Sequence, residues 1–288
     1  KGAASASIYG TRAANGVILV TTKQGKKGKP ALTYNMSLRT QSPTGVPNQI
    51  WNSGQYMELF NKAVARNAVS AVPFPQALID KYKDPNRDKN MFPDYNWADA
   101  VWKSAPMQEH NVGVNGGSDA FKYNVSAGII DQKGVLMGHK YKRFNGLANL
   151  STTINKYITV GTNVSYMKGN SVSPYYENQN FVLMTITQAP LVKPYLPDGS
   201  GRYTDKAVPT GVGGTQNNRN PFWIANETYR DYEDWQANVQ GWLDVNFLQT
   251  EKMGLKWSSK YASRFAEQFR NIYHYGADAY YYLPENEY

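Results

Sequence analysis

A strict alternation of apolar and polar residues recurs along most of the chain, and it constrains the possible folds more than any other feature. In one stretch, apolar residues occupy every second position, at Phe121, Tyr123, Val125, Ala127 and Ile129. Successive side chains of a β-strand point to opposite faces, so this period predicts strands with one apolar and one polar face. The pattern predicts strands at residues 31–41, 108–117, 120–130, 143–154, 156–168, 234–248 and 254–267.

The sequence offers no candidate for a membrane-spanning helix. Its best apolar run, at residues 16–20, is far shorter than the roughly 18 residues that such a helix needs. Any passage through a membrane must therefore use strands. The chain also contains 22 Tyr, 7 Trp and 10 Phe, and several of these lie near predicted strand ends, as in the aromatic girdles of outer-membrane barrels.

Connection lengths separate a membrane barrel from a soluble β-sandwich, whose strands also alternate. Long excursions at residues 42–107 and 169–233 contrast with tight turns at residues 117–119, at Asn155 and at residues 250–253. All long loops therefore fall at one end of the predicted sheet, which is typical of outer-membrane barrels. We expect an all-β fold, namely the N-terminal part of a transmembrane antiparallel β-barrel. Seven strands leave open edges that hydrocarbon does not tolerate, so further strands are expected in the intact protein.

Composition excludes several classes of function. The chain has no Cys, which rules out disulfide scaffolds and thiol chemistry. Its net charge of +9 comes from scattered Lys and Arg, with one dense basic run at residues 23–29, so nucleic-acid binding is not expected. The chain opens on Lys-Gly-Ala-Ala without a leader, and we expect it to be an internal fragment.

Catalytic and metal sites find no support in the sequence. The three histidines, His110, His139 and His274, lack the spacing of metal ligands. The stretch at residues 84–88 resembles the start of a calcium loop, but Lys89 stands where that loop requires glycine. The glycines of residues 10–16 do not form a phosphate-binding pattern. The acidic pairs Glu233 with Asp234 and Asp94 with Asp99 have no accompanying nucleophile or base. We expect no enzyme activity, no cofactor and no metal.

One motif near the N-terminus resembles a known family. Residues 7–18, Ser-Ile-Tyr-Gly-Thr-Arg-Ala-Ala-Asn-Gly-Val-Ile, followed by Thr-Thr-Lys at residues 21–23, resemble the end of the plug domain in SusC/RagA-type TonB-linked outer-membrane proteins. The stretches at residues 97–119, 131–134 and 141–144 resemble the early barrel of that family. The plug-end motif is represented by Tyr9, Gly10, Arg12, Asn15 and Gly16.

This resemblance implies a domain organisation, a location and partners. Residues 1–29 would end a plug domain, and residues 30–288 would begin a barrel of about 22 strands with extracellular loops at 42–107, 169–233 and 268–288. The protein would lie in the cell outer membrane, surrounded by its lipid. It would pair with a SusD-like surface lipoprotein and draw energy from TonB through a region that precedes this sequence. The ligand would be an oligosaccharide, with oligopeptide as the alternative.

Aromatic residues in the predicted loops are the candidate contact residues. Flat apolar faces with polar edges suit sugar rings, a lipoprotein lid or simple loop packing, and the sequence leaves these three interpretations open. The candidates are Tyr175, Tyr176, Phe222, Trp223, Tyr229, Tyr232, Tyr280, Tyr281 and Tyr282. A helix at residues 55–67 should pack within the first long loop through Tyr56, Leu59, Phe60, Ala63 and Val64.

Three functions remain in competition. The first is active import of nutrient oligomers across the outer membrane. The second is a surface adhesion or structural barrel that transports nothing, and a TonB box upstream would favour the first over it. The third is a soluble all-β binding module, which would be extracted without detergent.

Overall fold

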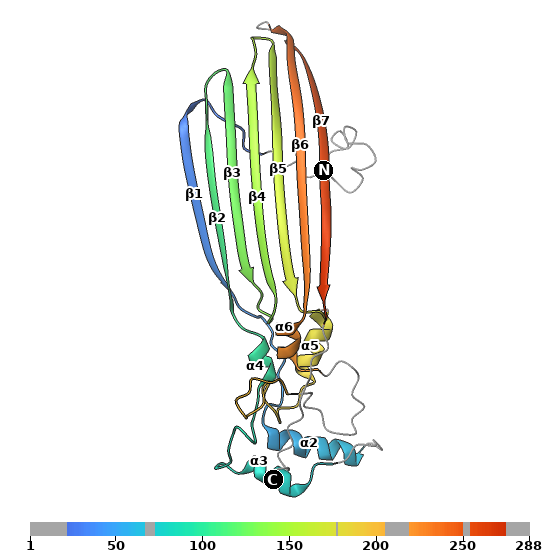
Figure 1. Cartoon of the computed structure of the whole chain (residues 1–288). Coiled ribbons are helices and arrows are strands. Elements are labelled where there is room, and N and C mark those ends of the chain that lie inside the picture. The colour runs from blue at the N-terminus through green and yellow to red at the C-terminus, as the bar shows by residue number, and fades with distance from the viewer. Residues whose placement is uncertain (1–21, 67–72, 177, 205–218, 250–253, 275–288) are drawn as a thin grey trace.

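The computed structural model shows a long antiparallel sheet with a helical lobe at one end (Figure 1). It describes residues 22–66, 73–176, 178–204, 219–249 and 254–274. Seven strands pair in chain order, each with its sequence neighbour. The strands are β1 (Gly28–Gln41), β2 (Ala105–Gly117), β3 (Phe121–Lys133), β4 (Lys140–Thr153), β5 (Ile158–Ser173), β6 (Tyr229–Gln249) and β7 (Gly254–Tyr273). The predicted all-β antiparallel fold is confirmed, and the sheet is open.

The strands extend further toward the helical lobe than the sequence predicts. The loops predicted at 42–107 and 169–233 are shorter, because β2 begins at Ala105, β5 continues to Ser173 and β6 begins at Tyr229. The third predicted loop, 268–288, is wrong at its start, since β7 runs to Tyr273. At the ends of β5 and β6, polar residues occur on both faces, so apolar alternation stops while backbone pairing continues.

Short turns lie at the end of the sheet opposite the lobe (Figure 1). The β2–β3 turn closes through the Ser118 amide, which donates to the Phe121 carbonyl at 2.7 Å. In the β4–β5 turn, the Asn155 side chain accepts from the backbone amides of Tyr157 and Ile158 at 2.8 and 2.9 Å. Both predicted tight turns are therefore confirmed, whereas residues 250–253 lie outside the described part.

The register of the pairing sorts the side chains into two faces. One face, here called the apolar face, presents the row Val114–Val125–Ala148–Val164–Val239 across β2 to β6. Its side chains are open to solvent, with Leu32 of β1 72% exposed. A contiguous exposed apolar surface of this extent requires a covering partner or lipid. The apolar and polar alternation of the sequence is thus realised as two chemically distinct faces.

The opposite, polar face is rich in side-chain amides. One row across β2 to β6, the amide row, consists of Asn115, Asn124, Asn149, Asn163 and Gln240. Within it, Asn115 donates to Asn124 at 3.2 Å and Asn163 donates to Gln240 at 3.2 Å. Elsewhere on this face, Gly161 leaves space for the Trp242 ring, because a Cβ on Gly161 would lie 2.4 Å from that ring. The polar face is therefore closely packed with hydrogen-bonding groups.

Helices from both long connections form the helical lobe. The first connection holds α2 (Ser53–Arg66), α3 (Gln76–Lys83) and α4 (Trp97–Val101), and the second holds α5 (Asn178–Ile186) and α6 (Pro221–Glu227). None of the helices in the described residues has the length and apolar character needed to cross a membrane. The helix predicted at 55–67 is confirmed as α2, but its predicted face is only partly right. Met57 is fully buried against Ile79 and Tyr82 of α3, whereas Leu59 is exposed.

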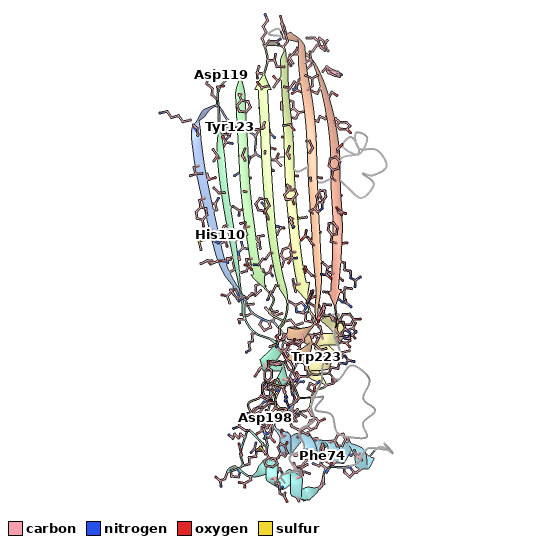
Figure 2. The ribbon with its side chains drawn as sticks, viewed as in Figure 1. Phe74, His110, Asp119, Tyr123, Asp198 and Trp223 are labelled. Atoms are coloured by element: carbon pink, nitrogen blue, oxygen red, sulfur yellow. The ribbon has the colours of Figure 1, made fainter. Side chains whose placement is uncertain are left out.

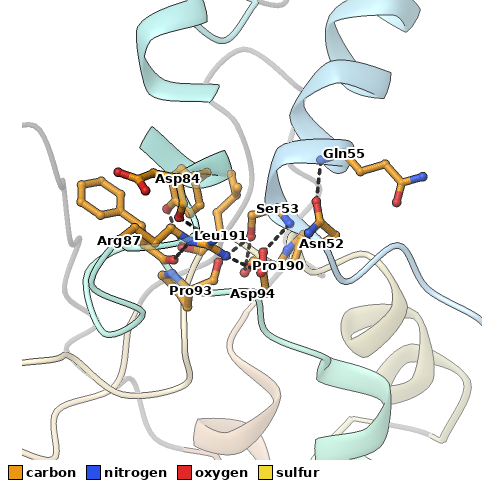
Figure 3. A network of polar contacts seen from close by, with 11 residues as sticks. Asn52, Ser53, Gln55, Asp84, Arg87, Pro93, Asp94, Pro190 and Leu191 are labelled. Atoms are coloured by element: carbon orange, nitrogen blue, oxygen red, sulfur yellow. Dashed lines mark hydrogen bonds and ion pairs between the residues drawn. The ribbon is translucent and has the colours of Figure 1, made fainter. Parts of the chain in front are cut away.

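Polar contacts lock the two connections of the lobe together (Figure 3). Arg87 forms an ion pair with Asp94, with side chains only 9% and 19% exposed. The Ser53 amide donates to Asp94 at 2.7 Å, and the Ser53 hydroxyl donates to the Pro190 carbonyl at 3.1 Å. Trp97 and Tyr82 donate to the neighbouring carbonyls of Ala189 and Leu191. The segment 189–191 of the second connection is thereby held by the first.

Candidate functional site

Two surfaces are candidates for function, namely the aromatic residues where strands meet the lobe and the polar face of the sheet. Trp223 marks the junction between strands and lobe, while Asp198 and Phe74 lie within the lobe (Figure 2). Tyr280, Tyr281 and Tyr282 lie outside the described residues. The plug-end motif of Tyr9, Gly10, Arg12, Asn15 and Gly16 also falls outside them.

The first aromatic cluster at the junction unites three of the candidates. Tyr175 and Tyr176 meet edge to face with ring centroids 5.1 Å apart, and the His274 ring lies 4.1 Å from that of Tyr175. Trp223 lies 6.5 Å from His274 and is buried at 6% exposure in a core with Phe181. Burial lowers the pKa of His274, and the charge of Arg219 lowers it further. Tyr175 and Tyr176 remain available for contact, whereas Trp223 supports them from within.

Phe222 belongs to a second aromatic cluster, which reaches the lobe surface. Its ring lies 6.1 Å from that of Trp97 and 6.0 Å from that of Tyr195. Tyr195 and Tyr203 pair at 5.1 Å, and the Tyr203 hydroxyl donates to Glu227 at 2.9 Å. Burial raises the pKa of Tyr203 to about 12. The cluster therefore presents a tyrosine pair with a carboxylate at its rim.

The remaining two candidates lie on opposite faces of the sheet. Tyr229 stacks on Tyr273 with centroids 5.4 Å apart on the apolar side of the β6–β7 pair. Tyr232 lies on the polar face, where the Arg270 guanidinium sits 5.1 Å from its ring centroid. The structure therefore does not gather all the predicted aromatics into one site.

Sequence reasoning missed Tyr195 and Tyr203 as surface aromatics. A signal was present, because they flank the turn sequence Pro-Asp-Gly-Ser-Gly at residues 197–201. The turn is closed by the Leu196 amide, which donates to the Arg202 carbonyl at 2.9 Å. A hairpin around this turn places the two rings side by side.

Charge on the polar face is predominantly positive. Its basic residues in the strands are Arg39, Lys122, Arg143, Arg230, Lys256, Lys260, Arg264 and Arg270. Its acidic residues are Glu109, Asp234 and Asp244. The basic residues outnumber the acidic ones, so the face attracts anionic groups.

The polar face also holds the segment that precedes β1. The Asn149 side chain donates to the Lys23 carbonyl at 2.6 Å, and Asn115 donates to the Gln24 carbonyl at 3.1 Å. Beside this segment lies a cavity of about 460 Å³, whose lining includes Gln24, Lys122 and Trp242. The cavity lining also includes Ala120, Thr153 and Thr159, so the segment and the cavity share the end of the sheet that bears the short turns.

The groups that the sequence analysis set aside have structural partners. His110 hydrogen bonds to the Tyr34 hydroxyl at 2.7 Å, and His139 contacts the Asn178 side chain at 2.8 Å. In the stretch that resembles a calcium loop, Asp84 and Asp88 accept hydrogen bonds from backbone amides two residues ahead. Among the described residues, no group of three His, Cys, Asp or Glu side chains is placed to hold a metal.

Comparison with known proteins relates the chain to receptors of one type. It is 26% identical over 277 residues to a TonB-dependent receptor of Formosa agariphila, covering 94% of this chain and 24% of the relative. It is 29% identical over 173 residues to the TonB-dependent receptor SusC of Bacteroides thetaiotaomicron, covering 59% of this chain and 15% of that protein. The chain thus spans about a quarter or less of these relatives. No protein-family model matches it.

The fold agrees with the sequence relatives. The RagAB peptide importer in its closed-closed state matches with a TM-score of 0.64 and 22% identity, covering 91% of this chain and 31% of that one. A structure of the RagAB peptide transporter matches with a TM-score of 0.62 and 24% identity, again over 91% of this chain. At this level of identity the match shows the fold alone. The relatives are named as receptors and transporters. Sequence and fold agree with the resemblance: the chain is similar to part of SusC/RagA-type TonB-dependent receptors.

Proposed function

We propose that the intact protein imports nutrient oligomers across the outer membrane as a TonB-dependent barrel. The observation that carries the proposal is the pair of faces on the sheet. The apolar face, with Leu32 and Tyr34 exposed, suits lipid, while the polar face suits a water-filled lumen. The open edges at β1 and β7 are completed by strands beyond this chain, since unpaired edges are unstable in hydrocarbon.

The same proposal assigns the ends and the domains of the chain. The short turns face the periplasm, and the helical lobe is extracellular, as in outer-membrane barrels. Residues 1–29 form the end of a plug domain, and residues 30–288 form the first part of the barrel. TonB acts through the plug, and a SusD-like lipoprotein covers the lobe. RagAB and SusC, the proteins that this chain resembles, support this assignment.

Glycan is our preferred ligand, and oligopeptide is the alternative. The junction rings of Tyr175 and Tyr176 and the lobe pair of Tyr195 and Tyr203 offer flat apolar surfaces with polar edges, which suit sugar rings. The basic excess of the polar face favours glycans that carry carboxylate or sulfate groups. The solved RagAB structures concern a peptide importer, so the experiment includes peptides as the alternative ligand.

Competitive uptake by whole cells tests the proposal. Cells with and without the intact gene would receive neutral malto-oligosaccharides, oligogalacturonates, sulfated oligosaccharides and tryptic peptides, and depletion of each would be followed by mass spectrometry. We expect the gene to be needed for depletion of an anionic glycan, and a protonophore to abolish that depletion. Gene-dependent depletion of peptides alone would reassign the ligand. Retention of every probe, with the protein present in the outer membrane, would favour the adhesion barrel.

A further inference from the structure

The segment Thr22–Lys27 lies across the polar face of the sheet, near the short turns. Its backbone is held by two asparagines from different strands, Asn115 of β2 and Asn149 of β4. Asn149 donates to the Lys23 carbonyl at 2.6 Å and to the Thr22 hydroxyl at 3.2 Å. Asn115 donates to the Gln24 carbonyl at 3.1 Å and accepts from the Lys26 amide at 3.3 Å. These contacts fix both ends of the segment.

Gly25 allows the middle of the segment to lie directly against the polar face of the sheet. A Cβ at this position would lie 2.3 Å from the Tyr123 backbone nitrogen and 2.7 Å from the Lys122 carbonyl carbon. Those atoms belong to β3 and cannot move without breaking the pairing of the strand. The approach therefore requires glycine, and the segment rests on β3 while β2 and β4 hold its flanks.

Both asparagines belong to the amide row, and their side chains are positioned to hydrogen bond to the segment. Asn115 is oriented by its hydrogen bond to Asn124 at 3.2 Å. Asn149 is only 1% exposed, and both hydrogen bonds that its side chain donates go to the segment. The two hydrogen bonds link the segment to β4. An ion pair between Lys27 and Asp119, at 2.6 Å, adds a link on the surface.

We propose that Thr22–Lys27 is a fixed anchor, so that any displacement of the plug during import begins N-terminal to Thr22. The inference rests on the proposed function, because it assumes a plug that moves. The anchor contacts β2 to β4, and the neighbouring cavity of about 460 Å³ extends from Lys122 of β3 to Lys260 of β7.

The presence of the anchor can be measured without transport. A spin label at Lys26→Cys in the purified full-length protein should give a broad, immobilised spectrum. The double variant Asn115→Ala with Asn149→Ala should sharpen that spectrum to one of a mobile chain. Asn163→Ala is the matched control, because Asn163 belongs to the amide row but bonds to Gln240, and it should leave the spectrum broad. An unchanged spectrum in the double variant would overturn the anchor.

Cross-linking tests whether the anchor stays in place during import. Gln24→Cys and Ser151→Cys line the same cavity, and a short reducible bis-methanethiosulfonate reagent would join them in the full-length protein on cells. Uptake should proceed at the same rate before and after reduction of the link. Uptake lost on linking and restored by reductant would show that the segment must leave the wall. Failure of the unlinked protein to import would refute the proposed function, while the spin-label result would still decide the anchor.

Discussion

The Asp94→Ala variant is expected to lose the ordered helical lobe while the sheet remains folded. Removal of this carboxylate leaves the Arg87 guanidinium buried without its counter-charge, at a cost of about 3–5 kcal/mol. It also removes the acceptor of the Ser53 amide, at the point where the two connections meet. We therefore expect the first connection to separate from the second and the lobe to lose its order.

Limited proteolysis of the intact protein in detergent would measure this effect, with rapid cleavage in the lobe and protection of the strands. Glu58→Ala is the matched control, since it breaks an ion pair with Lys83 whose side chains are 39% and 48% exposed. Such a pair contributes about 0–1 kcal/mol, so cleavage should stay slow. Replacement of both Arg87 and Asp94 by leucine should recover part of the protection, because no buried charge then remains. Equal cleavage of Asp94→Ala and Glu58→Ala would contradict the role given to the buried pair.

The Val125→Arg variant should reduce the amount of protein assembled in the outer membrane. Val125 lies on the apolar face between Val114 and Ala148, in the middle of that face. An arginine at mid-depth on the lipid side of a barrel costs about 2–4 kcal/mol. The neighbouring Ser126 points to the polar face, so Ser126→Arg introduces the same charge on the opposite side.

Heat-modifiable migration in gels, which separates assembled from unfolded barrel, would score both variants after outer-membrane isolation. We expect the assembled fraction to fall for Val125→Arg and to persist for Ser126→Arg. The reverse order would mean that the apolar face does not contact lipid, and the outer-membrane assignment would fail with it.

Alternation made the strands predictable from the sequence, but it did not determine their length. Between Lys168 and Ser173, and in the paired stretch from Tyr229 to Asp234, polar residues occupy both faces. Backbone hydrogen bonds extend the sheet there without any apolar pattern. Strand limits beyond the apolar belt therefore depend on the partner strand, which no local pattern encodes.

The sequence predicted which residues belong to the candidate site, but it did not predict how those residues are arranged in space. Tyr175, Tyr176 and Trp223 do meet, yet the depth of Trp223 follows from packing against α5, a contact between distant parts of the chain. The buried face of α2 was similarly misjudged, since Met57 faces α3 through a helix pairing that the spacing of apolar residues did not reveal. Periodicity identifies which residues can be buried, and tertiary contacts select among them.

The joined connections of the helical lobe have a consequence for the order of folding. Ser53, Tyr82 and Trp97 donate to carbonyls that lie 137, 109 and 92 residues further along the chain. Those carbonyls follow β5 in the chain, so the lobe closes only when the segments on either side of the β2–β5 stretch are brought together. A partner that recognises the closed lobe would therefore bind only after both connections have formed.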